Sequence, residues 1–160
     1  MTAMETQLAL LLNGLRKKEL ALIEIVNITE NQRTVIESGL PLPEIRTMMF
    51  EMNKEKQVHI DMVKGCDNMF EAMLKEIGPQ LDAQQDMYKP QVAELQTHIR
   101  RIMDYDVKVR VAEEQNNVLL SDITPVGPQQ QGLTPRAKSL PTDSVKVIQA
   151  YEREQNFRKE

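Results

Sequence analysis

Residues 45–77 read IRTMMFEMNKEKQVHIDMVKGCDNMFEAMLKEI, and the spacing of their apolar side chains is the strongest indication of the fold. Ten mostly apolar positions recur along it at alternating intervals of four and three residues without a skip: Ile45, Met49, Met52, Lys56, His59, Val63, Cys66, Phe70, Met73 and Ile77. A strict heptad repeat predicts a helix that supercoils left-handedly against its neighbours. The segments before and after this helix also have apolar residues at helical spacing. Gly and Pro residues separate both segments from it.

The segment before this stretch predicts a first helix over residues 4–38. Its apolar stripe contains Leu8, Leu12, Leu15, Leu22, Val26 and Ile36, widened by Leu11 and Ile25. Gly39 suits the left-handed position that commonly ends a helix. Pro41 and Pro43 prevent the first helix from continuing, while Pro43 can stand in the first turn of the next one.

The segment after this stretch predicts a third helix, which follows a corner or a kink at Gly78 and Pro79. Its heptad runs Leu81, Tyr88, Val92, Leu95, Ile99, Ile102, Val109 and Leu120, interrupted by Gln85, Asp106, Glu113 and Asn116. Pro90 either kinks this helix or marks its start. Residues 104–111, DYDVKVRV, also alternate with the period of a strand, but a solitary strand between helices has no partner. We therefore expect a helix there.

These elements predict an all-α fold, an elongated antiparallel three-helix bundle of coiled-coil character over residues 1–120. Short corners make neighbouring helices antiparallel, and about 34 residues rising ~1.5 Å each give rods of roughly 50 Å. The composition agrees, because only 4% of the 160 residues are aromatic, Trp is absent and Met occurs ten times. Residues 121–160 are expected to form a flexible tail: a Pro-rich linker over 121–142 and a short C-terminal segment that can fold on binding.

Charge and cysteine content restrict the partners and the compartment. The formal net charge is -4, so a nucleic-acid backbone would be repelled. The single Cys66 cannot form an internal disulfide, and the N-terminal apolar run from Leu8 to Leu12 is too short for a signal peptide or a membrane span. We expect a cytoplasmic protein that neither binds nucleic acid nor inserts into membranes.

A search for catalytic or metal-binding residues finds little. Cys66 follows His59 by seven residues, about 10 Å along a helix, which is too far for a thiolate–imidazole pair. Glu55 with His59 and Glu94 with His98 stand four apart, but further inward carboxylates for a metal site are not evident. Core packing is expected for His59 and Cys66, and a solvated face for Glu94 and His98. The sequence predicts no enzyme activity, no cofactor and no metal.

Two features exceed those of a plain bundle. The second helix is rich in Met, which suits either an adaptable binding surface or irregular gaps in the core. On the third helix, Val107, Val111 and Val118 cluster opposite the heptad seam, so this helix needs a second neighbour. That neighbour is either a fourth helix, from the C-terminal segment or a second copy, or an external protein. The residues expected to bind a partner are Val107, Lys108, Arg110, Val111, Val118, Leu119 and Tyr151.

The layout resembles the FlgN and FliT type of flagellar export chaperone, as found in firmicute-like bacteria. The resemblance spans about residues 5–120 and is carried by KELALIEIVNITENQ (residues 18–32), EKQ (55–57), CDNMF (66–70), LQTHI (95–99) and AEEQN (112–116). It implies a small acidic helical chaperone that binds hook-associated or filament-cap proteins in the cytoplasm before type III export and delivers them to the export machinery. A chaperone of this kind is expected to be a monomer or weak homodimer. The alternative expectation is a homodimeric coiled-coil adaptor without a secretion client.

Overall fold

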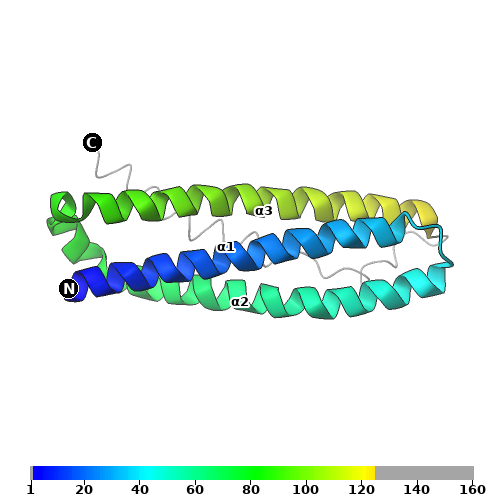
Figure 1. The fold of residues 1–160 in the computed structure, drawn as a ribbon, viewed down its shortest axis with the longest axis horizontal. Coiled ribbons are helices and arrows are strands. Elements are labelled where there is room, and N and C mark those ends of the chain that lie inside the picture. Colours follow the sequence, from blue (N-terminus) through cyan, green and yellow to red (C-terminus); the bar gives the residue numbers. More distant parts are fainter. Residues whose placement is uncertain (1, 125–160) are drawn as a thin grey trace.

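A computed structural model describes residues 2–124, which form three long helices and one short helical turn (Figure 1). The elements are α1 (Ala3–Ile36), α2 (Leu42–Ala83), the 3-10 helix η1 (Gln85–Tyr88) and α3 (Lys89–Ile123). Consecutive long helices run antiparallel and together make a rod. The all-α prediction is therefore confirmed for these residues, and the stretch 104–111 is helical. The tail beyond Thr124, including Tyr151, lies outside the described residues.

Helix α1 begins at a capping box and ends just before a glycine with left-handed backbone geometry. At its start, the hydroxyl of Thr2 accepts from the backbone N–H of Glu5, and the Glu5 carboxylate accepts from the backbone N–H of Thr2. At its end, Gly39 has a φ of 77°, the left-handed conformation that Gly adopts without steric cost. Pro43 then stands in the first turn of α2, as the sequence predicts.

The second corner lies later than Gly78 and Pro79. Helix α2 continues through both residues to Ala83, and η1 makes the turn, so of the two alternatives at Gly78 and Pro79 the corner is wrong and the helix is not terminated there. Pro79 lacks one backbone donor, but Ile77 and Leu81 on either side are fully buried in the core, and this packing holds the helix together. Pro90 stands in the first turn of α3 and marks its start.

At three of the ten predicted seam positions of α2, the buried residue is the next one along the chain. Met49, Val63 and Phe70 are buried as predicted, together with Ile45, Lys56 and Ile77. The alternate seam positions shift forward by one, because Asn53, Ile60 and Asp67 are buried where Met52, His59 and Cys66 were expected. Those three expected core residues, like Met73, are only half-buried. The core packing predicted for His59 and Cys66 is thus only partial.

The other two helices follow complete heptads once buried polar residues are included. Helix α3 has no interruption, since Asp106, Glu113 and Asn116 are buried at the positions where the apolar pattern breaks. Helix α1 likewise buries Lys18, Thr29 and Gln32. The apolar core falls into two clusters, and the smaller one, at the end of the rod near the α1–α2 turn, contains Ile36, Ile45, Met49 and Leu120. The rest forms one main core.

The helices do not pack equally against one another. Helix α1 lies close along both α2 and α3, whereas the backbones of α2 and α3 stay farther apart. Helices α1 and α2 approach closely at Gly14, where an added Cβ would lie 2.6 Å from the methyl carbon of Met69, a residue that is 40% exposed. Among the described helices, none has an apolar stretch long enough to cross a membrane.

Candidate partner-binding groove

The three valines singled out on α3 are exposed. Val107, Val111 and Val118 leave 53%, 48% and 57% of their surface accessible. They lie on one side of α3, away from the heptad seam, because residues three, four or seven apart share a helix face. Their exposure is what a binding face requires, and whether a partner covers it stays a prediction.

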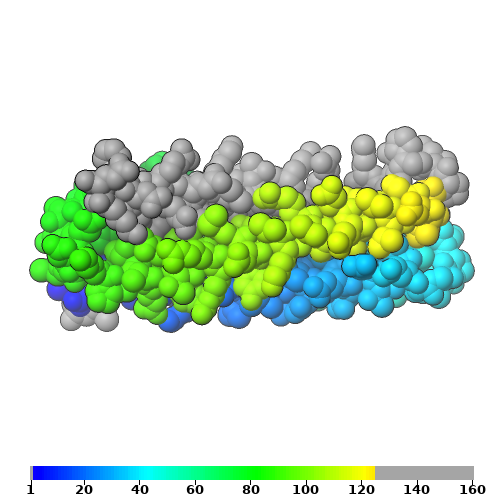
Figure 2. Space-filling view, turned by 90° about the horizontal axis from the view of Figure 1, so that it is seen from above, coloured from blue at the N-terminus to red at the C-terminus, as the bar shows by residue number. Residues whose placement is uncertain are grey.

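A groove runs between α1 and α3 beside these valines. Its volume is about 570 Å³, within the ~300–1,000 Å³ range of sites that accept small ligands or a few side chains. It is lined by Val26, Thr29, Glu30, Arg33, Val107, Lys108, Val111, Ala112, Gln115 and Asn116. In Figure 2 the yellow-green half of α3 lies directly against the blue part of the chain that belongs to α1. Four of these lining residues are apolar, namely Val26, Val107, Val111 and Ala112, and the other six are polar or charged.

Polar contacts connect α1 and α3 on both sides of the groove. On one side, Glu19 lies 3.9 Å from a guanidinium nitrogen of Arg101, and on the other Arg33 donates to the Gln115 side chain at 3.3 Å. Glu19 and Arg33 are two heptads apart on α1, as Arg101 and Gln115 are on α3, so both pairs belong to the same seam between the helices. Arg33 and Gln115 are themselves lining residues at one end of the groove, whereas Glu19 and Arg101 lie beyond its other end.

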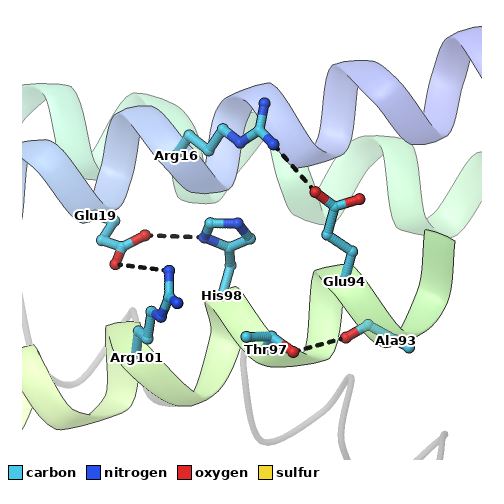
Figure 3. Close-up of polar contacts among 7 residues, drawn as sticks. All are labelled: Arg16, Glu19, Ala93, Glu94, Thr97, His98 and Arg101. Atoms are coloured by element: carbon cyan, nitrogen blue, oxygen red, sulfur yellow. Dashed lines mark hydrogen bonds and ion pairs between the residues drawn. The ribbon is translucent and has the colours of Figure 1, made fainter. Parts of the chain in front are cut away.

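The cluster at the Glu19 end revises the prediction for His98 (Figure 3). The His98 side chain is only 12% exposed, and its Nδ1 lies 2.9 Å from a Glu19 carboxylate oxygen, so the solvated-face prediction is wrong for it. That prediction holds for Glu94, which is exposed and pairs with Arg16 at 3.1 Å. Figure 3 shows the His98 ring turned toward α1. The contacts of His98 and Glu94 therefore connect α3 to α1. Residues 2–124 contain no cluster of His, Cys, Asp and Glu side chains suited to a metal ion.

The remaining predicted binding residues divide into two groups. Lys108 lines the groove, with its ammonium 5.1 Å from the centre of the Tyr105 ring. Arg110 and Val118 are exposed on α3 but do not line the groove. Leu119 is half-buried and packs against the small end cluster, so it belongs to the core. The groove thus brings together Val107, Lys108 and Val111 from the predicted set.

Sequence reasoning missed two groups of buried polar side chains. In the first, Lys18 of α1 donates to the Asp67 carboxylate of α2. Asp106 of α3 interacts electrostatically with both of these charged groups. Asp106 is 0% exposed, and neither of its carboxylate oxygens has a hydrogen-bond partner among the described residues. Burial, reinforced by the Asp67 charge and opposed by Lys18 and Arg110, raises the pKa of Asp106 to about 7.

The second group has two residues from each helix: Thr29, Gln32, Asn53, Lys56, Glu113 and Asn116. Lys56 donates to the Glu113 carboxylate and to the Gln32 side-chain oxygen, so it joins α2 to both other helices. Burial lowers the pKa of Lys56, while the adjacent Glu113 opposes that shift. In α3 the sequence signal for these groups is a polar residue at a heptad position, at Asp106, Glu113 and Asn116, whereas Asn53 and Asp67 of α2 stand outside the predicted seam.

Cys66 is half-buried in an environment that disfavours its thiolate form. Burial, with the charge of Asp67, raises the pKa of its thiol, although Lys18 and Lys17 oppose the shift. A thiol that keeps its proton is a poor nucleophile and a poor metal ligand.

Searches with this chain among protein-family models, curated proteins and solved structures found no match.

Proposed function

We propose that this protein is a cytoplasmic secretion chaperone without enzymatic activity, which binds apolar helical segments of flagellar hook-associated or filament-cap proteins before their export. The observation that carries the proposal is the exposed row of Val107, Val111 and Val118 beside the α1–α3 groove. Contiguous apolar patches on the surface of a protein commonly mark sites where another molecule binds. The client identity rests on the resemblance of residues 5–120 to export chaperones.

The chemistry of the groove defines the kind of helix that fits. Val107 and Val111 are spaced by four residues and can contact the apolar stripe of an amphipathic helix laid along α3. Lys108 and Arg33 line the groove with one opposing carboxylate, Glu30, and Arg110 adds a further positive charge on α3. A client helix with small apolar anchors and acidic flanks therefore complements the site in shape and charge.

A homodimeric adaptor is the second candidate, because a second copy could cover the same valines. Two copies would bring the same basic residues, Lys108 and Arg110, toward each other, and like charges at an interface oppose association. The charge pattern therefore favours an acidic client over a second copy. Sedimentation velocity over a range of concentrations distinguishes them, since the adaptor requires a stable dimer and the chaperone a monomer or weak dimer.

The test is a charge placed in the centre of the strip. Val111→Asp leaves a solvated carboxylate in the free protein but buries it unpaired in any complex through this face. We expect affinity for purified hook-associated or filament-cap protein from the same genome to fall at least about thirtyfold, or ~2 kcal/mol, by calorimetric titration. Helical circular dichroism should not change.

The matched control is Val58→Asp, which makes the same change at a residue that is 63% exposed on α2. It should bind as the wild type does. Unchanged affinity of Val111→Asp would remove the groove from consideration. Equal losses in both variants would show that the effect does not come from this face.

A further inference from the structure

The apolar core is divided by the six polar residues of the second buried group, which we call the polar layer: Thr29, Gln32, Asn53, Lys56, Glu113 and Asn116. They occupy two consecutive heptad positions on every helix, three residues apart in each case. On one side of the polar layer lies the main core, and on the other lies the end cluster of Ile36, Ile45, Met49 and Leu120. No buried apolar cluster of the described residues spans both sides.

The polar layer is held by hydrogen bonds in place of apolar packing. Gln32 donates to the Asn53 side-chain oxygen at 2.6 Å, and Asn116 donates to the backbone carbonyl of Thr29 at 2.9 Å. The side-chain oxygen of Asn116 has no hydrogen-bond partner among the described residues. Water could satisfy all of these groups if the layer opened, including the oxygen that has no partner among the described residues.

Opening at this level therefore differs from opening elsewhere along the rod. Separating apolar layers exposes hydrocarbon to water, which is costly at every residue. Separating the polar layer exchanges buried polar contacts for hydration, and exchanging a buried ion pair such as Lys56 with Glu113 for water recovers its desolvation cost. Beyond the layer, four buried apolar residues hold the end of the rod closed.

The first buried polar group provides the contrast. Lys18, Asp67 and Asp106 contribute one residue per helix, and the main core continues past them without a break. Leu15 and Phe70 before them belong to the same cluster as Leu22 and Val63 beyond them. A single polar position on each helix thus leaves the core continuous, whereas two consecutive ones divide it.

We propose that the polar layer is a hinge plane, at which the end of the rod formed by residues 33–52 and 117–124 opens and closes as one unit while the main core stays folded. Local opening of a cooperative unit is a known property of proteins, and its free energy depends on the apolar contacts the unit must break. Thr29 and Asn116 also line the α1–α3 groove, so opening would widen the groove from beneath. That last consequence rests on the proposed function, whereas the opening itself does not.

Native-state hydrogen exchange of the free protein tests the hinge. Amides of residues 46–52 and 119–123 should exchange at least about tenfold faster than those of residues 63–77 and 95–106. Both end segments should share one opening free energy and one denaturant dependence, smaller than that of global unfolding. A single global opening for all amides would overturn the proposal. So would a graded, denaturant-independent exchange toward the helix ends, because that describes fraying.

Replacing the polar layer tests its role directly. The variant Gln32→Leu/Asn53→Leu/Lys56→Met/Glu113→Leu joins the two clusters, and the exchange of the end segments should slow to the rates of the main core. The control Lys18→Met/Asp67→Leu/Asp106→Leu changes the other polar group and should leave the ratio between end and core unchanged. Equal slowing in both variants, or none in the first, would contradict the hinge. If either variant does not fold, the shared opening of the wild-type segments decides alone, and no client enters the measurement.

Discussion

The carboxylate of Asp106 makes the stability of the bundle depend on pH. Its pKa is raised to about 7 in the folded protein, from 3.8 when exposed, because burial disfavours the charged form and Asp67 adds repulsion. The folded state therefore binds more protons than the unfolded state between these values, and stability falls as the pH rises through this window. The groups that face Asp106 are Lys18 from α1, Asp67 from α2 and Arg110 on its own helix.

We predict that Asp106→Asn stabilises the protein at alkaline pH. The variant removes a penalty of up to about 4 kcal/mol at pH 8, and its advantage over the wild type should shrink toward zero near pH 4. Thermal melts across this range measure the difference. Asp104→Asn, at an exposed position on the same helix, is the control and should parallel the wild type. Parallel profiles for Asp106→Asn as well would show that Asp106 does not titrate in this window.

The two faces of α3 should respond differently to truncation of a side chain. Leu95→Ala removes a side chain that is 1% exposed in the main core and should cost about 2–5 kcal/mol in the free energy of unfolding. Val111→Ala should cost less than about 1 kcal/mol, because that side chain is half exposed. Chemical denaturation measures both. Equal costs would mean that the valine face is internal in solution, covered by a fourth helix.

Apolar periodicity predicted the helices of residues 2–124 well, and the polar interior poorly. The corner at Gly39 follows from local backbone chemistry, so it could be read from the sequence. The register of Asn53 and Asp67 could not, because both look like surface residues until their partners Gln32 and Lys18 are known. Pairing between side chains 21 and 49 residues apart is a tertiary property that no local pattern encodes. For the candidate site, the sequence indicated the exposed valines of α3. The groove could be recognised only from the position of α1 beside α3.

At the scale of the whole molecule, we predict that the chain folds without its C-terminal tail. The sequence placed the end of the helical body at residue 120, but α3 runs to Ile123 and Thr124 is buried, its hydroxyl donating to the Leu120 carbonyl at 2.6 Å. Truncation after Thr124 should keep a cooperative thermal transition within a few degrees of the full chain. Loss of cooperativity would make the tail part of the bundle.

The position of the polar layer also dictates where the chain tolerates changes in length. Heptad seams alone would let α3 slide by seven residues, since apolar positions resemble one another. After such a slide Lys56 could meet Asp106, but Glu113 would stand at the level of Leu120, among Ile36 and Met49, with its carboxylate unpaired. Insertions at the turn over residues 37–41 leave these pairings intact. Seven residues inserted between Asp106 and Glu113 would not, because Asp106 could stay beside Lys18 and Asp67 only if Glu113 moved away from Lys56, and the reverse.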